Sequence, residues 1–597
     1  MKRFVGCMLV LCCLLTGCGM QEAKQETTEY YVVLEENLAF DTQSHVQSVA
    51  AGADATFLIE PARGYELTGV RGAAAGDVVL HPRADGKVEL QVKQVKRHLN
   101  LVVDATLQEV TLICELGQER EQRITRLRIH EGINTPRLEE VDAIPGYRLI
   151  GWQTRSGESI PCGSRMKPEE DFRLKAILVP EAKGELFSYE ASGDGIKITG
   201  MRACSNGDFA QVLWENQMLQ LLVVPNQIQG RKVLGLASDA LVGIHCDGLV
   251  LPEGLRQIQQ NACKDCSFSK VFCYDRIEQA SDHGFDGVEG LKTLYVEAAM
   301  APRYSGTYYD TFPDKLGYIK TLRGQKKLVL FSGSSTRFGY DSQLLQEAFS
   351  DRKVVNMGVY AYANAYPELL LLLSAMESGD ILLDAPELDA TKSQFATSHL
   401  LEWQHFAMCE GDYGILAALD YRELDGVFTA FCAYQSRRLA MEARSYDLCA
   451  KGFDENGHPV KTSSYNRQGD YILYRPNATD EEPIFGLPVA YTKEALPYET
   501  FVKPYNAICR RFLEEGIRVY VTYAPRNRKA ISEESTPKNR AKLQEYLESN
   551  LEATVISDVE DYLYDGEYFY ETDNHLSSEG AILRTKQVIE DLNAQNE

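Results

Sequence analysis

A repeat of 22 residues is the feature that most constrains how this 597-residue chain can fold. Apolar side chains recur at this step between Leu186 and Ala299. The recurring sets are Val233, Leu255 and Ile277; Leu236, Ile258 and Ala280; Leu241, Cys263 and Phe285; and Leu251, Cys273 and Tyr295. A fixed period of about 20 to 50 residues is typical of stacked units that share one core. The segment therefore predicts three turns of a solenoid.

The residues between the turns point to a family. Leu251 to Leu255 (LPEGL) separates two turns, and Ile228 to Val233 leads into the repeat. Residues 186–300 resemble the BspA-type leucine-rich repeat of bacterial surface proteins. Such repeats present an extended face to partners. The resemblance thus implies either a scaffold or a surface for a protein partner.

The cysteines of the repeat form a pattern that also occurs in zinc sites. Cys263 and Cys266 make a Cys-x-x-Cys pair, with Cys246 nearby. The register aligns Cys263 with Phe285 of the next turn, a position for a buried side chain. We therefore expect small core residues here. We expect neither a metal nor an organic cofactor.

The first residues have the organisation of an export signal. Two cations precede an apolar run from Phe4 to Leu15, which is too short to span a bilayer. Leu15 to Cys18 (LTGC) resembles the bacterial lipobox. The resemblance implies a signal peptide over residues 1–17 and a lipid on Cys18, which would anchor the chain to the outer face of the cell membrane. An ordinary secretory leader is the alternative.

Two β-rich segments follow a polar tether at residues 18–29. Short alternating runs bounded by turn residues predict strands over residues 30–106 and 107–180. The segments share an element, GYELTGV from Gly64 and GYRLIGW from Gly146. The second resembles the internalin-type B-repeat, a β-grasp-like surface module, and the first a diverged bacterial surface β repeat. Both an inert spacer and a ligand-binding role are open for them.

The charge balance excludes one class of partner. The chain has 62 basic and 86 acidic residues, a net charge of -24. Such a field repels phosphate backbones, so we expect no nucleic-acid partner.

The pattern changes again after residues 301–325, which contain Gly and Pro breaks and are predicted to be a linker. From 326 to 597, apolar runs alternate with helical stretches, as is typical of an α/β domain with a mainly parallel sheet. Strands are expected at 328–331, 354–357, 381–383, 519–523 and 553–556, and helices at 341–349, 366–376, 500–515 and 538–550. The fold class is therefore multidomain: β modules, a short solenoid and a C-terminal α/β domain.

Two blocks of this domain carry residues for nucleophilic chemistry. Ser332 to Gly339 (SGSSTRFG) follows the first strand, and a small-residue turn there exposes a side chain at the ligand-binding edge of the sheet. Phe569 to Ala581 (FYETDNHLSSEGA) places His575 among carboxylates just before a final helix. A histidine held by a carboxylate is the base that a nucleophilic serine needs.

Together the blocks resemble the SGNH (GDSL-like) hydrolase superfamily, in its exported branch that acts on acyl groups of cell-envelope polymers. The resemblance implies a flavodoxin-like fold for residues 326–597. The Gly-Ser-Ser at 333–335 matches the nucleophile block and assigns Ser335 as nucleophile. Gly358 matches the second block, so its amide and that of Ser335 would form the oxyanion hole. Asp573 and His575 match the acid–base block.

The chain departs from the family pattern in two places that matter. The third block reads DAPE at 384–387 and lacks the oxyanion-hole asparagine, for which Asn364 is a weaker substitute. The family's Asp-x-x-His spacing would place Thr572 at the acid. The acid is then Asp573, with Glu571 as the alternative and Asp558 as a more distant one.

The resemblance implies a serine esterase or O-acyltransferase that acts on O-acyl groups, chiefly O-acetyl, of an extracellular or cell-wall glycan. Hydrolysis and transfer share one acyl-enzyme, so the sequence leaves the acceptor open. The alternative is a non-catalytic adhesion or glycan-binding lipoprotein with a degenerate α/β domain. The missing third block and the large N-terminal part, residues 1–325, favour that alternative.

Overall fold

The chain is multidomain and rich in small β-sheets, with most of its helices in the C-terminal part. The structure is a computed structural model. It describes residues 29–35, 39–42, 44–61, 65–74, 76–83, 86–117, 119–128, 132–142, 144–167, 172–304, 309, 311–359, 363–388, 395, 399–442, 466, 468–471, 474–478 and 487–595. Two compact units divide the chain, one formed by Met1–Pro61 with Glu66–Thr106 and the other by Ala62–Tyr65 with Leu107–Glu597. Cys18 and the signal-like segment lie outside the described residues.

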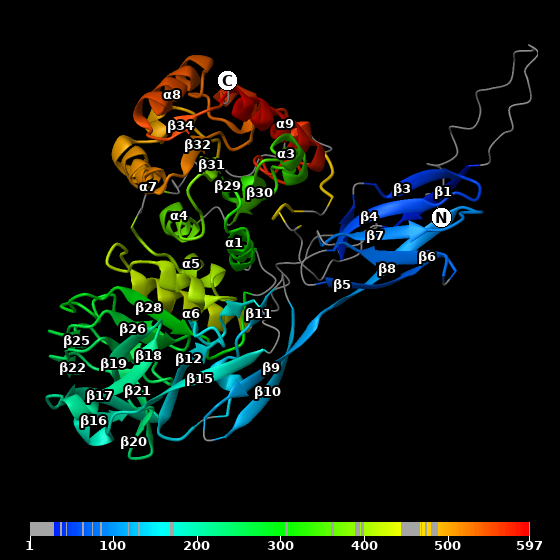
Figure 1. The fold of residues 1–597 in the computed structure, drawn as a ribbon. Coiled ribbons are helices and arrows are strands. Elements are labelled where there is room, and N and C mark those ends of the chain that lie inside the picture. The colour runs from blue at the N-terminus through cyan, green and yellow to red at the C-terminus, as the bar shows by residue number, and fades with distance from the viewer. Residues whose placement is uncertain are drawn as a thin grey trace, which may run out of the picture. The chain divides into compact units, whose positions relative to one another are not determined.

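Unit 1 consists of two four-stranded sheets around one apolar core (Figure 1). The first has the order β3-β1-β8-β5 and the second β2-β4-β7-β6. Their strands are β1 (Glu29–Leu34), β2 (Phe40–Thr42), β3 (Val46–Ala50), β4 (Ala55–Pro61), β5 (Tyr65–Arg71), β6 (Val78–Pro82), β7 (Val88–Val92) and β8 (Leu99–Leu107). Alternating burial along β4, in which Phe57 and Ile59 face inward, agrees with the period of two in its sequence.

Unit 2 begins with a five-stranded sheet of order β10-β9-β15-β12-β13 and a small pair, β11 with β14. The strands are β9 (Glu109–Glu115), β10 (Glu121–Leu127), β11 (Ile133–Asn134), β12 (Tyr147–Gln153), β13 (Ser159–Ile160), β14 (Arg165–Met166) and β15 (Arg173–Pro180). Trp152 is fully buried, and its indole N–H donates to Pro136 O at 3.0 Å. Trp152 is the last residue of GYRLIGW, which is the second segment's version of the element that both β segments share.

The repeat segment forms two main sheets, β16-β17-β21-β24-β27 and β18-β19-β23-β26-β28, with β20 beside β21 and a pair β22-β25. The strands are β16 (Phe187–Ser192), β17 (Gly195–Met201), β18 (Ala210–Trp214), β19 (Gln217–Val223), β20 (Gln227–Ile228), β21 (Arg231–Leu236), β22 (Leu241–Val242), β23 (Gly248–Val250), β24 (Gln257–Ile258), β25 (Cys263–Lys264), β26 (Lys270–Tyr274), β27 (Gln279–Ala280) and β28 (Thr293–Glu297). All the pairings from β21 to β24, β24 to β27, β23 to β26 and β26 to β28 are parallel.

The 22-residue step is the register of this pairing. Leu236 lies opposite Ile258, and Ile258 lies opposite Ala280. The step lengthens once, because Cys273 pairs with Val296 and not with Tyr295 as the strict period predicts. The turn before β28 accommodates the extra residue with two left-handed glycines, Gly287 at φ 78° and Gly290 at φ 80°.

The cysteines of the repeat are core residues, as expected. Cys263 and Cys273 are fully buried and Cys266 is 1% exposed. Burial raises the pKa of all three thiols, so they stay protonated and apolar. The ten cysteines that the structure describes are all free of disulfides.

The C-terminal sheet has five parallel strands in the order β30-β29-β31-β32-β34. They are β29 (Lys327–Ser332), β30 (Lys353–Gly358), β31 (Ile381–Asp384), β32 (Arg518–Val521) and β34 (Thr554–Val555), and a separate pair joins β33 (Arg526–Asn527) to β35 (Leu563–Tyr564). β29 lies between β30 and β31, so the turn that follows it is at the carboxyl edge of the sheet, after an interior strand.

Most of the helices lie around this sheet, whereas α5 and α6 lie beside the repeat (Figure 1). They are α1 (Thr311–Thr321), α2 (Ser334–Arg337), α3 (Ser342–Ala348), α4 (Ala365–Leu373), α5 (Trp403–Met408), α6 (Val427–Glu442), α7 (Lys503–Glu514), α8 (Pro537–Asn550) and α9 (Ser578–Ala594). Short helical turns are η1 (Leu138–Glu140), η2 (Gly184–Leu186), η3 (Asn206–Asp208), η4 (Tyr413–Ala418), η5 (Lys493–Ala495), η6 (Tyr498–Val502), η7 (Arg528–Ala530), η8 (Val559–Tyr562) and η9 (Gly566–Tyr568). No helix in the described part of the chain combines the length and the apolarity that crossing a membrane requires.

The segment 301–325 was predicted to be a linker, and that prediction is wrong. It contains helix α1, whose Phe312, Leu316 and Ile319 are buried in the core. The spacing of these side chains gives one apolar stripe on a helix, which the Gly and Pro residues of the segment obscured. The ammonium of Lys315 donates to Gly358 O at 2.7 Å, so α1 is fastened to the end of β30.

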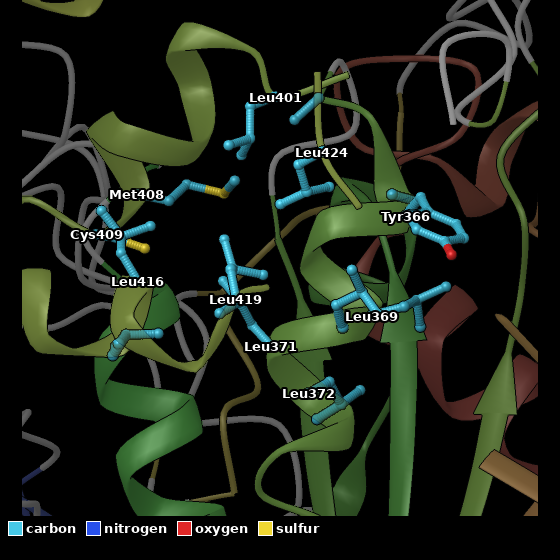
Figure 2. Packing of buried hydrophobic residues seen from close by; sticks show 14 of the residues in the cluster. Tyr366, Leu369, Leu371, Leu372, Leu401, Met408, Cys409, Leu416, Leu419 and Leu424 are labelled. Carbon is cyan, nitrogen blue, oxygen red and sulfur yellow. The ribbon is translucent and has the colours of Figure 1, made fainter. Parts of the chain in front are cut away.

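An insertion between β31 and β32 connects the sheet domain with the repeat. Figure 2 shows Leu369, Leu371 and Leu372 of α4 together with Leu416 and Leu419 of the insertion in one apolar cluster. That cluster also includes side chains of the repeat, such as Leu251. The repeat and the parallel sheet therefore share a continuous core.

Candidate active site

The serine turn begins where β29 ends. Gly333 is the N-cap of α2, and Ser334 is the first helical residue. Gly358, at the end of the neighbouring β30, packs so closely on the turn that a Cβ there would collide with the backbone of Arg337. A short strand-to-helix turn at the carboxyl edge of a parallel sheet thus presents Ser334, which is partly exposed, to solvent.

The histidine loop is held by its own hydrogen bonds. Phe569 and Leu576 form an antiparallel bridge, and the N–H of Tyr570 donates to His575 O at 2.9 Å. The N–H of His575 donates to Thr572 Oγ1 at 3.0 Å. The ring of Phe338 packs against the imidazole, with 4.5 Å between ring centroids. These contacts fix the position and tilt of the His575 side chain.

Serine, histidine and a carboxylate meet at this edge. His575 Nε2 lies 2.8 Å from Ser334 Oγ, and His575 Nδ1 lies 3.2 Å from Glu571 Oε1. With the proton on Nδ1, the imidazole donates to Glu571 and accepts from the hydroxyl of Ser334. The side chains of His575 and Glu571 are 14% and 45% exposed, so the site is open to solvent.

Ser335, the residue expected to be the nucleophile, does not face His575. It is fully buried, and its hydroxyl has no hydrogen-bond partner among the residues that the structure describes. Its N–H donates to Glu387 Oε1 at 2.9 Å, and its carbonyl accepts from Arg584 Nη1 at 2.9 Å. Successive residues of a helical turn point about 100° apart, so only one of the two adjacent serines can face the edge of the sheet. The predicted pairing of Ser335 with His575 is wrong.

The preferred acid is also displaced. Asp573 is buried and pairs with Arg526, whose Nη1 lies 3.0 Å from Asp573 Oδ1. Burial raises the pKa of the Asp573 carboxyl, against the opposing charge of Arg526. Glu571, the alternative of the sequence analysis, contacts the imidazole instead. Asp558 is not involved, because it caps η8 by accepting from Glu560 N at 2.9 Å.

Both amides expected to form an oxyanion hole already have acceptors. The N–H of Ser335 is bound to Glu387, and that of Gly358 donates to Asn356 Oδ1 at 2.8 Å. Asn364 is remote from this role, since it caps α4 and its Nδ2 donates to Leu400 O at 2.9 Å. The amide of Ser334 is the first of α2, and an amide at that place has no acceptor within its own helix.

Glu387 belongs to the site although its sequence pattern did not predict it. Its Oε1 accepts from Ser335 N–H at 2.9 Å, and its Oε2 accepts from Asn574 Nδ2 at 3.1 Å. It is 7% exposed and so joins the neighbour of Ser334 to the neighbour of His575 inside the protein. A glutamate after the third strand, in the block that lacks the expected asparagine, was the available signal in the sequence.

Two arginines, Arg526 and Arg475, bind the segments that carry Ser334 and His575 without contacting either side chain. Arg526 Nη2 donates to Leu388 O at 2.7 Å, which ties the histidine loop to the segment of Glu387 through Asp573. Arg475 Nε and Nη2 donate to Leu576 O at 2.9 Å and to Phe338 O at 3.0 Å. Burial lowers the pKa of Arg475 to about 10, so it is still cationic at neutral pH.

The arrangement can activate a hydroxyl for attack on an electrophilic carbon. Within the described ranges, no cluster of three or more His, Cys, Asp or Glu side chains could hold a metal ion.

Comparisons with family models, with curated proteins and with solved structures found no match for this chain.

Proposed function

We propose that this chain is a lipid-anchored surface protein whose C-terminal domain is a serine esterase or O-acyltransferase for O-acyl groups of an extracellular or cell-wall glycan. The observation that carries the proposal is the 2.8 Å contact between Ser334 Oγ and His575 Nε2, with Glu571 behind the imidazole. A nucleophile, a base and an orienting acid in this geometry are the parts of acyl transfer through a covalent intermediate.

The proposed reaction has two steps. Ser334 Oγ bonds to the acyl carbon while its proton passes to His575 Nε2, and collapse of the tetrahedral intermediate sends that proton to the leaving sugar oxygen. Water or a second sugar hydroxyl then attacks the acyl-serine, and His575 takes the proton of that nucleophile. As the acyl carbon–Oγ bond breaks, His575 returns the proton to Ser334 Oγ, and the serine is free again. Glu571 stabilises the imidazolium in both steps. The amide of Ser334 would donate to the oxyanion, a contribution of about 3 kcal/mol for a well-aligned donor.

Family assignments belong to the same proposal. The parallel order β30-β29-β31-β32-β34, with the serine turn after β29, supports a flavodoxin-like SGNH domain. Parallel pairing at a 22-residue step supports a BspA-type leucine-rich repeat. The internalin-type B-repeat over residues 107–180, the diverged surface β repeat over residues 30–106 and the lipid on Cys18 rest on the sequence motifs.

One observation favours the alternative, a non-catalytic adhesion or glycan-binding lipoprotein. The amides of Ser335 and Gly358 are bound to Glu387 and Asn356, so neither is available to an oxyanion in this conformation. A domain that has lost catalysis would show such occupied donors. We rank this function second because a histidine already placed on a partly exposed serine has no evident structural purpose.

Labelling with a fluorophosphonate probe tests the proposal, because the probe reacts only with an activated serine. We expect the full-length protein to be labelled, and labelling to be lost in Ser334→Ala and in His575→Ala. Ser335→Ala is the matched control, since it removes the hydroxyl of the adjacent buried serine, and it should keep the label. Loss of labelling in Ser335→Ala alone, in a folded protein, would contradict the assignment. No labelling of the folded wild type would support the binding protein.

A further inference from the structure

A cavity of about 450 Å³ lies between the second β module and the start of the repeat. This volume falls within the range of about 300 to 1,000 Å³ that is usual for small-molecule sites. Both walls belong to unit 2 and share an apolar core that includes Ile150, Val179 and Trp214. The cavity is separate from the residues of the serine site.

The walls are held in place by Arg148, which is 2% exposed. Its Nη1 donates to Leu251 O at 2.8 Å, and its Nη2 lies 2.8 Å from Glu181 Oε1 and donates to Val224 O at 3.2 Å. One buried guanidinium thus connects β12 with two turns of the repeat. These bonds hold the two walls of the cavity in a fixed arrangement.

One wall is apolar and the other is polar. Leu138, Val141, Ile144 and Leu178 are partly exposed apolar residues of the first wall, and the 45% exposed ring of Tyr147 lies beside them. The second wall carries two carboxylates and two amides. These are the side chains of Glu181, Asn226, Gln227 and Glu253.

The acidic side chains of the lining are already neutralised. Glu181 pairs with Arg148 at 2.8 Å, Glu253 with Arg276 at 3.6 Å and Asp142 with Arg120 at 3.6 Å. A paired carboxylate no longer selects a cation, but its remaining lone pairs still accept hydrogen bonds from hydroxyls. A lining with neutralised acids, amides and an apolar wall suits a neutral molecule that has hydroxyls on its rim and C–H groups on its face.

We propose that this cavity is a glycan-binding subsite that takes a neutral pyranose unit. The C–H face of the sugar would pack on the apolar wall and Tyr147, and its hydroxyls would bond to Asn226, Gln227 and Glu253. This inference goes beyond the proposed acyl chemistry and does not depend on it.

Calorimetric titration of the full-length protein with chitotriose, cellotriose, xylotriose and maltotriose tests the inference. At least one trisaccharide should bind at millimolar concentration or below. Tyr147→Ala should weaken that binding about tenfold, as truncation of an aromatic anchor does. Glu253→Gln, which keeps the size of the side chain, should weaken it less.

Two control variants distinguish binding in this cavity from binding elsewhere on the protein. Tyr498→Ala removes a tyrosine of similar exposure, 51%, from the C-terminal domain and should leave the affinity unchanged. Ser334→Ala should also bind normally, which keeps this result distinct from failure of the serine chemistry. Tetra-alanine, a peptide, is titrated as the competing class of ligand. The inference is overturned if no trisaccharide binds, and binding of tetra-alanine alone would indicate a peptide site. It is also overturned if binding is unaffected in both Tyr147→Ala and Glu253→Gln.

Discussion

Two clusters in unit 2 combine acids, a base and hydroxyls from distant parts of the chain, and they differ in burial. In the first, Arg438 Nε lies 2.6 Å from Glu410 Oε1 and Arg438 Nη1 lies 3.3 Å from Asp275 Oδ2. Tyr434 donates to Glu410 Oε1 at 2.8 Å, and its hydroxyl lies 2.5 Å from that of Tyr413. The three charged side chains are at most 3% exposed.

The serine site has similar distances but a different setting. Glu571 is 45% exposed, and the serine hydroxyl has only the imidazole as its hydrogen-bond partner among the described residues. In the buried cluster all three charged side chains form ion pairs. These pairs connect Asp275 of the repeat with Glu410 and Arg438 of the insertion. Similar contacts therefore serve stability where solvent is excluded and can serve chemistry where a reacting atom is accessible.

The largest effect that would sharpen this comparison is a catalytic one. Glu571→Gln should lower kcat for an acetyl ester about 10⁴-fold, because the imidazolium loses the charge that stabilises it. Asp573→Asn should lower kcat by less than about tenfold, because Asp573 pairs with Arg526 and not with the imidazole. Steady-state rates of p-nitrophenyl acetate hydrolysis measure both. A greater loss of kcat in Asp573→Asn than in Glu571→Gln would show that Asp573 is the acid of the site, as the sequence predicted.

A stability effect of nearly the same size is expected in the buried cluster. Arg438→Met leaves Asp275 and Glu410 buried without their cation, which should destabilise the protein by up to about 5 kcal/mol. Urea denaturation followed by tryptophan fluorescence, with Trp403 near the cluster, measures the loss. Ser334→Ala is the comparison variant and should unfold within about 0.5 kcal/mol of the wild type. Equal stability of the two variants would remove the distinction between the clusters.

A buried acid without a cation partner in the described part of the chain sharpens the contrast through pH. Burial raises the pKa of Asp384 to about 7 from 3.8, whereas Asp275, beside Arg438, reaches only about 6. Between pH 4 and 7 the folded state holds a proton at Asp384 that the unfolded chain has released, so stability decreases as the pH rises. The decrease is up to about 4 kcal/mol. Asp384→Asn should flatten this part of the pH profile of the unfolding free energy, and an unchanged slope would contradict the assignment.

The smallest effect concerns the positioning of the serine turn. In Glu387→Gln the side chain has one acceptor oxygen in place of two, so it can accept from Ser335 N–H or from Asn574 Nδ2 but not from both. We therefore expect kcat to fall about tenfold with KM unchanged. Glu387→Ala should lose more, and the partial rescue by glutamine separates positioning from folding. If KM rises and kcat is constant, Glu387 contacts substrate and does not act through the turn.

Local patterns were sufficient for most elements of the fold. The strands β29, β30 and β31, which the sequence analysis expected within a few residues of their bounds, are continuous apolar runs, as buried parallel strands require. Helix α1 was missed because its glycine and proline residues suggested a linker, whereas packing on β30 stabilises the helix. Propensity is a weak signal beside tertiary packing.

The sequence alone determined the 22-residue step between β21, β24 and β27, the alternation of strands and helices in the C-terminal domain, and the two blocks that meet in the site. Those features depend on spacing along the chain, which a pattern records. Only the tertiary structure decided that Ser334 and not Ser335 meets His575, 241 residues away, and that Glu571 and not Asp573 stands behind it. The reason is physical: one residue of rotation in a helical turn, or two residues in a loop, exchanges a buried side chain for an exposed one, and only long-range packing selects between them.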